Sequence, residues 1–157
     1  MGIETERKFL VTGDFLSHFT SATRLTQGYL SRDPERTVRV RVDSGEKEAW
    51  ITIKGLSSPD GMSRSEWEYD IPYTEGLAML NLPGVQSLSK VRYLVPVGHY
   101  EYEVDVFLGM NQGLVIAEVE FTAGDPDVEV PIWVGEEVTG DVRYYNSSLI
   151  DNPYTKW

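Results

Sequence analysis

Hydrophobic and polar residues alternate along most of the chain in short runs, a pattern typical of strands rather than of long helices. Eight such runs are separated by turn residues: 4–11, 25–30, 37–43, 48–54, 64–71, 90–96, 100–107 and 114–122. Three stretches favour short helices: 15–19 after the N-cap Asp14, 74–82 capped by Thr74 with Leu77, Met79 and Leu80 as its apolar side, and a closing helix at 144–150. Strands joined by short turns predict an antiparallel meander, and hence a β-sandwich or a closed barrel.

The polar positions of these runs are mostly charged. Residues two apart in a strand point to the same side, so Arg39 and Arg41 share one face while Val38, Val40 and Val42 share the other. The same alternation recurs in seven runs. A solvent-exposed face explains any one of them, because antiparallel sheets often have one wet side.

Two observations favour a different reading of the whole set. Lys, Arg, Asp and Glu fill the polar positions almost completely, with little Ser, Thr or Gln. The signs are also sorted by strand, since residues 39, 41, 90 and 92 are basic whereas residues 103, 105, 118 and 120 are acidic. A merely solvated face has no reason to separate its charges in this way.

Closing the sheet would turn this charged face into a lumen. Half of the chain's 14 basic residues would then line it: Lys8, Arg39, Arg41, Lys54, Arg64, Lys90 and Arg92. Repelling cations packed together need an anion, and neighbouring carboxylates suit Mg²⁺ or Mn²⁺. Phosphate oxygens, cations and a divalent metal are the components of phosphoryl transfer.

Composition narrows the class of protein further. The 157 residues predict a single domain, 1–157, of globular composition. The net charge of −11 disfavours nucleic acid and anionic membranes as partners. The absence of cysteine, of a signal peptide and of a long apolar run predicts a cytoplasmic location without a membrane span.

Several motifs, taken in order, resemble the CYTH domains of the triphosphate tunnel metalloenzyme superfamily. Glu4-Thr5-Glu6-Arg7-Lys8 matches the E-x-E-x-K signature of that family. The other matching segments are 27–30, 38–41, 52–55, 103–107, 118–121 and 135–146. The resemblance covers nearly the whole chain and implies an eight-stranded antiparallel tunnel, a mainly β (α+β) fold with a charged lumen and a few flanking helices.

The resemblance also implies a chemistry and a set of residues. Family members hydrolyse or cyclise triphosphates with Mg²⁺ or Mn²⁺, and short bacterial members are most similar to inorganic triphosphatases. The implied metal ligands are Glu4, Glu6, Asp105, Glu118 and Glu120. The implied phosphate-binding residues are Lys8, Arg39, Arg41, Lys54, Arg64, Lys90, Arg92 and Arg143.

Tyr29 and Lys90 are the candidates for catalysis. Cations around Lys90 would lower its pKa and let it deprotonate or orient water. The simpler interpretation keeps Lys90 as one more phosphate clamp and Tyr29 as a packing or hydrogen-bonding residue.

Three alternatives to hydrolysis of inorganic tripolyphosphate remain open. They are an adenylate cyclase, a thiamine or nucleoside triphosphatase on the same tunnel, and a non-enzymatic polyphosphate-binding module. The outer wall of such a barrel carries apolar residues, including Trp67 and Tyr69, which predict packing against helices or a homodimer. Arg7 points to that outer side, where we expect a salt bridge.

Overall fold

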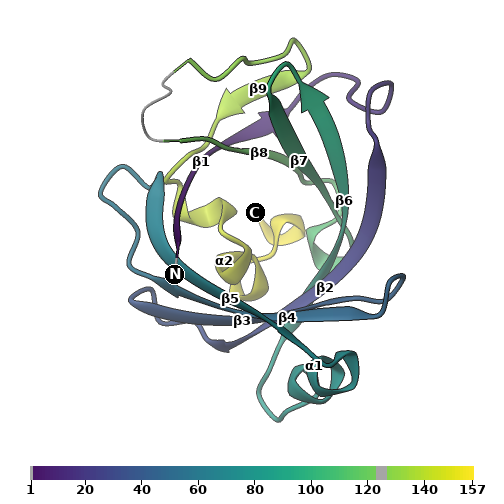
Figure 1. Ribbon diagram of the computed structural model, residues 1–157, viewed down its shortest axis with the longest axis vertical. Coiled ribbons are helices and arrows are strands. Elements are labelled where there is room, and N and C mark those ends of the chain that lie inside the picture. The colour runs from purple at the N-terminus through teal and green to yellow at the C-terminus, as the bar shows by residue number, and fades with distance from the viewer. Residues whose placement is uncertain (1, 123–126) are drawn as a thin grey trace.

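The strands form one closed antiparallel sheet (Figure 1), which the computed structural model describes over residues 2–122 and 127–157. The strands are β1 (Gly2–Val11), β2 (Ser21–Ser31), β3 (Arg36–Asp43), β4 (Glu48–Gly55), β5 (Ser63–Ile71), β6 (Ser87–Val97), β7 (Tyr100–Phe107), β8 (Val115–Glu120) and β9 (Val134–Glu137). They lie in the order β5-β4-β3-β2-β6-β7-β8-β1-β9, and β5 also pairs with β1. The predicted eight-stranded barrel is therefore confirmed, with β9 as an extra strand on β1.

Strand β1 closes the barrel because it pairs on both sides. Its first residues, from Gly2 to Thr5, pair with β5 on one side. From Glu6 to Leu10 it pairs with β8 on the other side. Strand β9 takes the place of β5 near Phe9 and Val11. No alternation in the sequence predicted β9, which has only four residues and depends on this pairing.

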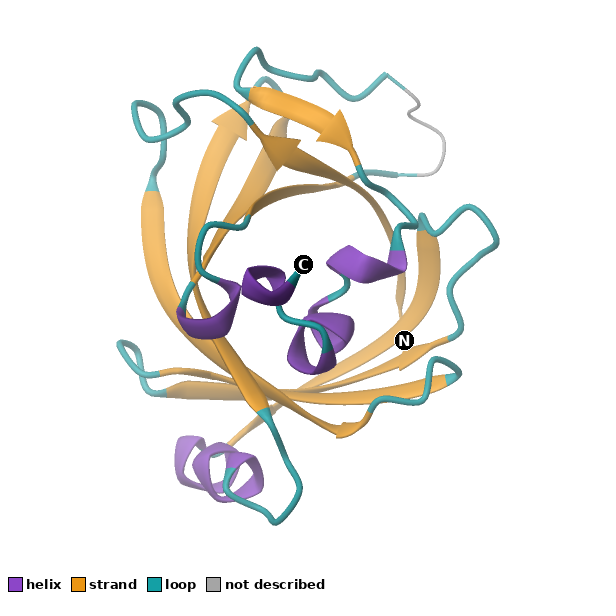
Figure 2. Ribbon diagram, turned by 180° about the vertical axis from the view of Figure 1, so that it is seen from behind, coloured by secondary structure: helices purple, strands orange, loops and turns teal. Residues whose placement is uncertain are grey.

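The helical elements are short. They are α1 (Tyr73–Leu80), α2 (Asn146–Asp151) and the 3-10 turns η1 (Gly109–Asn111), η2 (Val142–Tyr144) and η3 (Tyr154–Lys156). Figure 2, a view along the barrel, shows the C-terminal helical segments within the ring of strands. No helix of the described residues is both long and apolar enough to cross a bilayer.

Apolar packing closes one end of the barrel and leaves the other end to charged groups. Leu149 of α2 is fully buried in a cluster with Leu88, Phe107, Leu114 and Ile116. These side chains come from β6, β7, β8 and the turn before β8, and they share the inward face with the charged residues further along the strands. The C-terminal helix thus forms an apolar floor beneath a polar lumen.

A second apolar cluster covers the outside of β1, β6, β7 and β8. It contains Phe15, Tyr102 and Trp133, with Phe15 and Tyr102 each in aromatic contact with Trp133. The predicted helix at 15–19 is wrong, because Phe15 and Phe19 instead pack edge-on against Tyr93 in a turn between β1 and β2.

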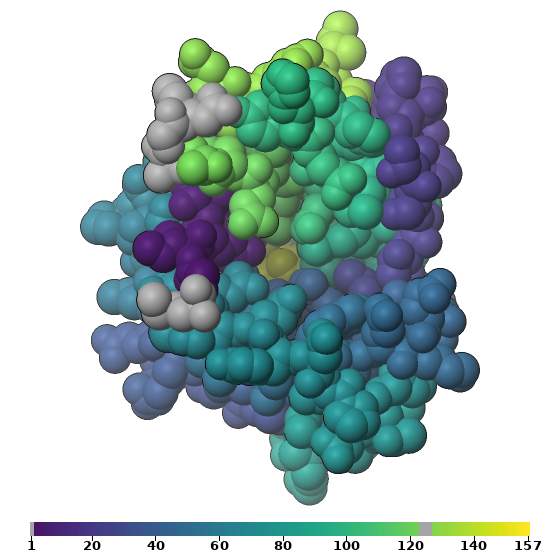
Figure 3. All heavy atoms as spheres, viewed as in Figure 1, coloured from purple at the N-terminus to yellow at the C-terminus, as the bar shows by residue number. Residues whose placement is uncertain are grey.

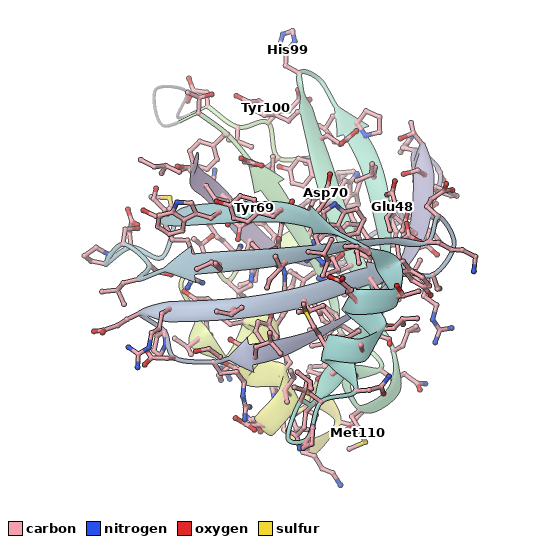
Figure 4. The ribbon with its side chains drawn as sticks, turned by 60° about the horizontal axis from the view of Figure 1, so that its bottom comes forward. Glu48, Tyr69, Asp70, His99, Tyr100 and Met110 are labelled. Atoms are coloured by element: carbon pink, nitrogen blue, oxygen red, sulfur yellow. The ribbon has the colours of Figure 1, made fainter. Side chains whose placement is uncertain are left out.

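Helix α1 covers part of the outer face of β3 and β4, in front of the sheet in Figure 4. Gly76 permits this contact, since a Cβ there would lie 2.7 Å from the Cβ of Ala49. The cap prediction is wrong: the helix begins after Pro72 without a side-chain cap. Leu77 is also 37% exposed rather than part of the packed side.

Candidate active site

The lumen holds a cavity of about 240 Å³ above the C-terminal floor. Figure 3 shows the hollow between the strands, with atoms of the C-terminal segment (yellow) at its bottom. Seven basic residues line it: Lys8, Arg39, Arg41, Lys54, Arg64, Lys90 and Arg92. Seven acidic residues also line it: Glu4, Glu6, Glu66, Glu68, Glu103, Glu118 and Glu120. The charged residues of the wall are therefore balanced in sign.

The two signs occupy different parts of the wall. Register pairs Glu6 with Glu120 across β1 and β8, and Glu103 with Glu118 across β7 and β8. Arg39 and Arg41 lie on β3, on the other side of the ring. The structure thus brings together every predicted site residue except Asp105 and Arg143. We call the carboxylate-rich part on β1, β7 and β8 the acidic side and the part on β3 the basic side, although ion pairs such as Arg39–Glu68 and Lys8–Glu118 bring opposite charges together within the wall.

Asp105 lies behind the lining and is 1% exposed. Its carboxylate accepts hydrogen bonds from Nζ of Lys90 at 2.6 Å and from Nε of Arg92 at 2.8 Å. Burial alone would raise its pKa, but Arg92 and Lys90 hold the pKa well below its ordinary value. Asp105 is therefore an ionised anchor for two cations of the wall.

Arg143 lies outside the lumen. Its guanidinium pairs with Asp141 at 2.9 Å and stacks on the rings of Tyr144 and Trp157. Its side chain is 61% exposed. This position tethers the turn before α2 rather than facing the cavity.

The basic side holds guanidinium groups with few anionic partners. Arg41 donates from Nε and Nη2 to Oε1 of Gln27, both at 3.1 Å, and Gln27 carries no charge. Burial, together with repulsion from Arg39 and Arg92, lowers the pKa of Arg41 to about 9. Arg39 donates to the Thr52 hydroxyl at 3.0 Å, while its buried Nε has no partner within the described part of the chain.

Carboxylates on the acidic side are in excess of their local cations. Lys54 pairs with Glu4 at 2.6 Å, and Lys8 pairs with Glu118 at 3.3 Å. Glu6 has no such partner among the described residues, and burial with repulsion from Glu118 and Glu4 raises its pKa to about 8. A carboxyl in this setting gains from a further cation.

These carboxylates are of the chemical type that binds a hard divalent cation, but their side chains are not arranged around one point. Carboxylate oxygens are the ligands that Mg²⁺ and Mn²⁺ favour. Across residues 2–122 and 127–157, no three acidic or histidine side chains already surround a common point. Instead, Glu4 is paired with Lys54, and Glu118 is paired with Lys8.

An acidic mouth opens beside this cavity. A second hollow of about 230 Å³ shares its acidic wall and adds His99, Tyr100 and Glu101. Figure 4 shows His99 and Tyr100 at one end of the molecule, at the turn between β6 and β7, and Met110 at the other end. The acidic end of the lumen is thus the end opposite the apolar floor.

Lys90 and Tyr29 both line the cavity, but no hydrogen bond joins them in the described chain. Lys90 is fully buried and donates to Asp105 and, at 3.0 Å, to Oδ1 of Asn146. Burial and the neighbouring Arg92 and Arg41 lower its pKa to about 7 despite the attraction of Asp105. The Tyr29 hydroxyl accepts from Gln27 at 3.1 Å.

Sequence patterns missed the residues that complete the wall from loops and from the C-terminal segment. They are Ser57, Gly61, Thr139, Gly140, Tyr145, Asn146 and Ser147. Gly61 and Gly140 make an especially close contact, since a Cβ on Gly61 would lie 2.4 Å from Cα of Gly140. Periodicity carries no signal for loop residues, so only their place in the resembling segment 135–146 could have identified some of them.

Three acidic residues that line the cavity, Glu66 and Glu68 on β5 and Glu103 on β7, were not among the predicted site residues. Glu68 lies 3.5 Å from Arg39, and Glu66 lies 3.6 Å from Lys54. Glu103 pairs with Arg92. Outside the lumen, Arg7 pairs with Glu137 at 2.8 Å, which confirms the predicted outer salt bridge.

Comparisons with known proteins agree with this fold. The CYTH domain model matches residues 2–154. An inorganic triphosphatase of Acetivibrio thermocellus is 43% identical over 98% of this chain and 97% of its own length. An inorganic triphosphatase of Nitrosomonas europaea is 37% identical over 93% of this chain and 95% of its own. The crystal structure of the inorganic triphosphatase NE1496 has a TM-score of 0.63 at 31% identity, covering 96% of this chain and 95% of that one.

Proposed function

Because the chain belongs to the CYTH domain family, we propose that its lumen binds a triphosphate and hydrolyses it, with inorganic tripolyphosphate as the substrate. The two curated relatives, both inorganic triphosphatases that match nearly end to end, support this activity. The products would be pyrophosphate and phosphate.

One observation carries the proposal: on the basic side of the lumen, Arg41 has no carboxylate partner among the described residues, and Arg39 has only Glu68, at 3.5 Å. Arg41 is held by an uncharged amide, and Nε of Arg39 has no partner in the described chain. Leaving buried cations without counter-charge is costly, so the site is built for an anion that arrives from outside. Guanidinium groups match phosphate oxygens in bidentate geometry.

A divalent cation, Mg²⁺ or Mn²⁺, fits the acidic side in donor chemistry. We propose that Glu4, Glu6, Glu118 and Glu120 would hold it, since the raised pKa of Glu6 marks a carboxyl cluster short of positive charge. When bound, the ion would supply charge neutralisation at phosphate oxygens. Asp105 is less suited to this role, because Lys90 and Arg92 already occupy its carboxylate.

The chain's own residues would hold the substrate between the two sides of the wall. Arg39 and Arg41 would bind phosphate oxygens from β3, while Lys8 and Lys54 would approach from β1 and β4 as point charges. Water adds to the terminal phosphorus, the bond to the bridging oxygen breaks, and pyrophosphate leaves. Fixed positive charge around the transferred group stabilises the transition state.

We propose that Lys90 takes part in proton transfer as well as in binding. A lysine with a pKa of about 7 is partly neutral near neutral pH, so it can accept a proton from water. The hydrogen bonds that its Nζ donates to Asp105 and Asn146 fix its position at the boundary between the lumen and the C-terminal floor. Tyr29 would contribute a hydroxyl donor to the substrate.

A phosphate-release screen tests the proposal. We expect tripolyphosphate to be hydrolysed with Mg²⁺ or Mn²⁺, and ATP, GTP and thiamine triphosphate to be poorer substrates. Removing both carboxylates of β8, in Glu118→Gln with Glu120→Gln, should abolish turnover. Absence of tripolyphosphate hydrolysis with either metal would refute the activity, and retained metal-free binding by an inactive protein would indicate a phosphate sensor.

A further inference from the structure

We propose that Gln27 is a positioning residue of this site, which holds Arg41 without cancelling its charge and turns the Tyr29 hydroxyl proton toward the substrate. The inference rests on the proposed function and deepens it. Gln27 does not contact the cavity itself: it lies on β2, behind the lining, and is fully buried.

Hydrogen bonding fixes the orientation of the Gln27 amide. Its Oε1 accepts from Nε and Nη2 of Arg41, both at 3.1 Å. A guanidinium can only donate, so the amide oxygen must face Arg41 and the amide nitrogen must face away from it. That nitrogen, Nε2, lies 3.1 Å from the hydroxyl oxygen of Tyr29.

The first consequence concerns the charge of Arg41. Arg92, which also lines the lumen, differs from Arg41 because its partners are the carboxylates of Asp105 and Glu103. A carboxylate partner fixes a guanidinium but also neutralises it, whereas an amide fixes it and leaves its full charge for a ligand. Arg41 is thus positioned for an anion before the anion binds. Burying its charge is unfavourable, which lowers its pKa.

The second consequence concerns the Tyr29 proton. Because Nε2 of Gln27 donates, the Tyr29 oxygen must accept in this bond, and the hydroxyl proton is left to be donated elsewhere. Within the described part of the chain the Tyr29 hydroxyl donates to no acceptor, and Tyr29 lines the cavity. A phosphate oxygen of the substrate would be such an acceptor.

Replacing the amide by a carboxylate of the same shape separates these roles from packing. In Gln27→Glu, Arg41 gains a counter-ion and the new carboxylate accepts the Tyr29 proton. We expect a higher melting temperature than wild type, a KM for tripolyphosphate raised roughly tenfold or more, and a lower kcat. A residue that only fills space would not raise stability and KM together.

Gln27→Met provides a second variant, which keeps the volume but removes all three side-chain hydrogen bonds. We expect a lower melting temperature and a lower kcat, because Arg41 and Tyr29 both lose their partner. Gln112→Glu is the matched control, since it makes the same chemical change at an exposed position outside the lumen. It should leave KM and kcat at wild-type values.

Two results would overturn the inference: an unchanged KM in Gln27→Glu, or the same loss of melting temperature in Gln27→Glu and Gln27→Met. The melting temperatures need no substrate and no activity. Should the wild-type protein fail to hydrolyse tripolyphosphate, the proposed function fails, while the melting temperatures still decide whether Gln27 holds Arg41 as a neutral partner.

Discussion

At the scale of single residues, two side chains on the same face of a strand can differ in whether they reach the cavity, a difference that alternation in the sequence does not predict. Glu103 and Asp105 are two apart on β7 and share the inward face, as the sequence predicted. Glu103 nevertheless lines the cavity, whereas Asp105 lies behind it with Lys90 and Arg92. Alternation identifies the face of a residue, but its depth depends on register across the whole ring, which a single sequence does not reveal.

The pKa of Glu6 leads to a prediction about pH and metal. The carboxyl is protonated in the folded state up to about pH 8, but its ordinary pKa is 4.5. Between these values the folded protein binds more protons than the unfolded one, so this group makes stability fall as pH rises. In buffer that contains a metal chelator, we expect the melting temperature of the wild-type protein to fall more steeply between pH 4.5 and about pH 8 than that of Glu6→Gln.

The comparison with Glu6→Gln is needed because Glu66 and Lys90 also titrate in or near this range. Added Mn²⁺ should restore wild-type stability most strongly above pH 8, where Glu6 is ionised and able to bind it. It should restore Glu6→Gln much less. Parallel melting curves for the two proteins, with and without Mn²⁺, would show that Glu6 neither titrates here nor binds metal.

At the scale of elements, α2 contributes both to the apolar core and to the site above it. Leu149 on its lower side is fully buried, while Asn146 at its start contacts Lys90. Leu149→Ala should therefore lower the free energy of unfolding by about 3 kcal/mol, through lost burial and the cavity left behind. Urea unfolding followed by tryptophan fluorescence would measure the change.

Ile132→Ala gives the matched control, because Ile132 is also aliphatic but 98% exposed. Its unfolding free energy should stay within about 0.5 kcal/mol of wild type. If Leu149→Ala behaved in the same way, the floor would not contribute to stability as the packing implies.

The sequence predicted elements well where alternation was sustained. All eight barrel strands were identified, and β3, with its arginines and valines on opposite faces, is the clearest case. The errors were in elements held by tertiary contacts. Strand β9 exists because β1 has a free edge, α1 begins where Pro72 ends β5, and residues 15–19 follow the packing of their aromatic rings.

At the scale of the whole molecule, the lumen is more balanced than the sequence suggested. The seven bases counted in the sequence do line the cavity, but an equal number of acids faces it, several of them on β5 and β7. What distinguishes the site is the arrangement: Arg41, held by an uncharged amide, on one side and carboxylates in excess of their local cations on the other. That arrangement follows from strand order around the ring, which composition cannot supply.

The contact between Gly61 and Gly140 joins the loop after β4 to the C-terminal segment, and both glycines line the cavity. Gly61 has φ +75°, so Gly61→Ala would combine backbone strain with a collision. We expect a loss of stability clearly greater than about 1 kcal/mol, together with reduced turnover, measured by urea unfolding and phosphate release.

Gly84→Ala separates the two causes, since Gly84 has φ +81° but no atom within 4 Å of an added Cβ. It should lose only about 1 kcal/mol and keep full turnover. Equal losses in the two variants would mean that the close contact adds nothing beyond the backbone strain.

The double pairing of β1 has a consequence for the order in which the protein folds. Its partners lie far along the chain, at residues 63–66, 116–120 and 134–137, so ring closure depends on contacts of long sequence separation. On the ribosome, the first strand to emerge must wait for nearly the last before it can complete its pairing. Because Glu6 and Glu120 become neighbours only at that step, no partly made chain exposes the assembled carboxylate cluster, and the site appears together with the finished barrel.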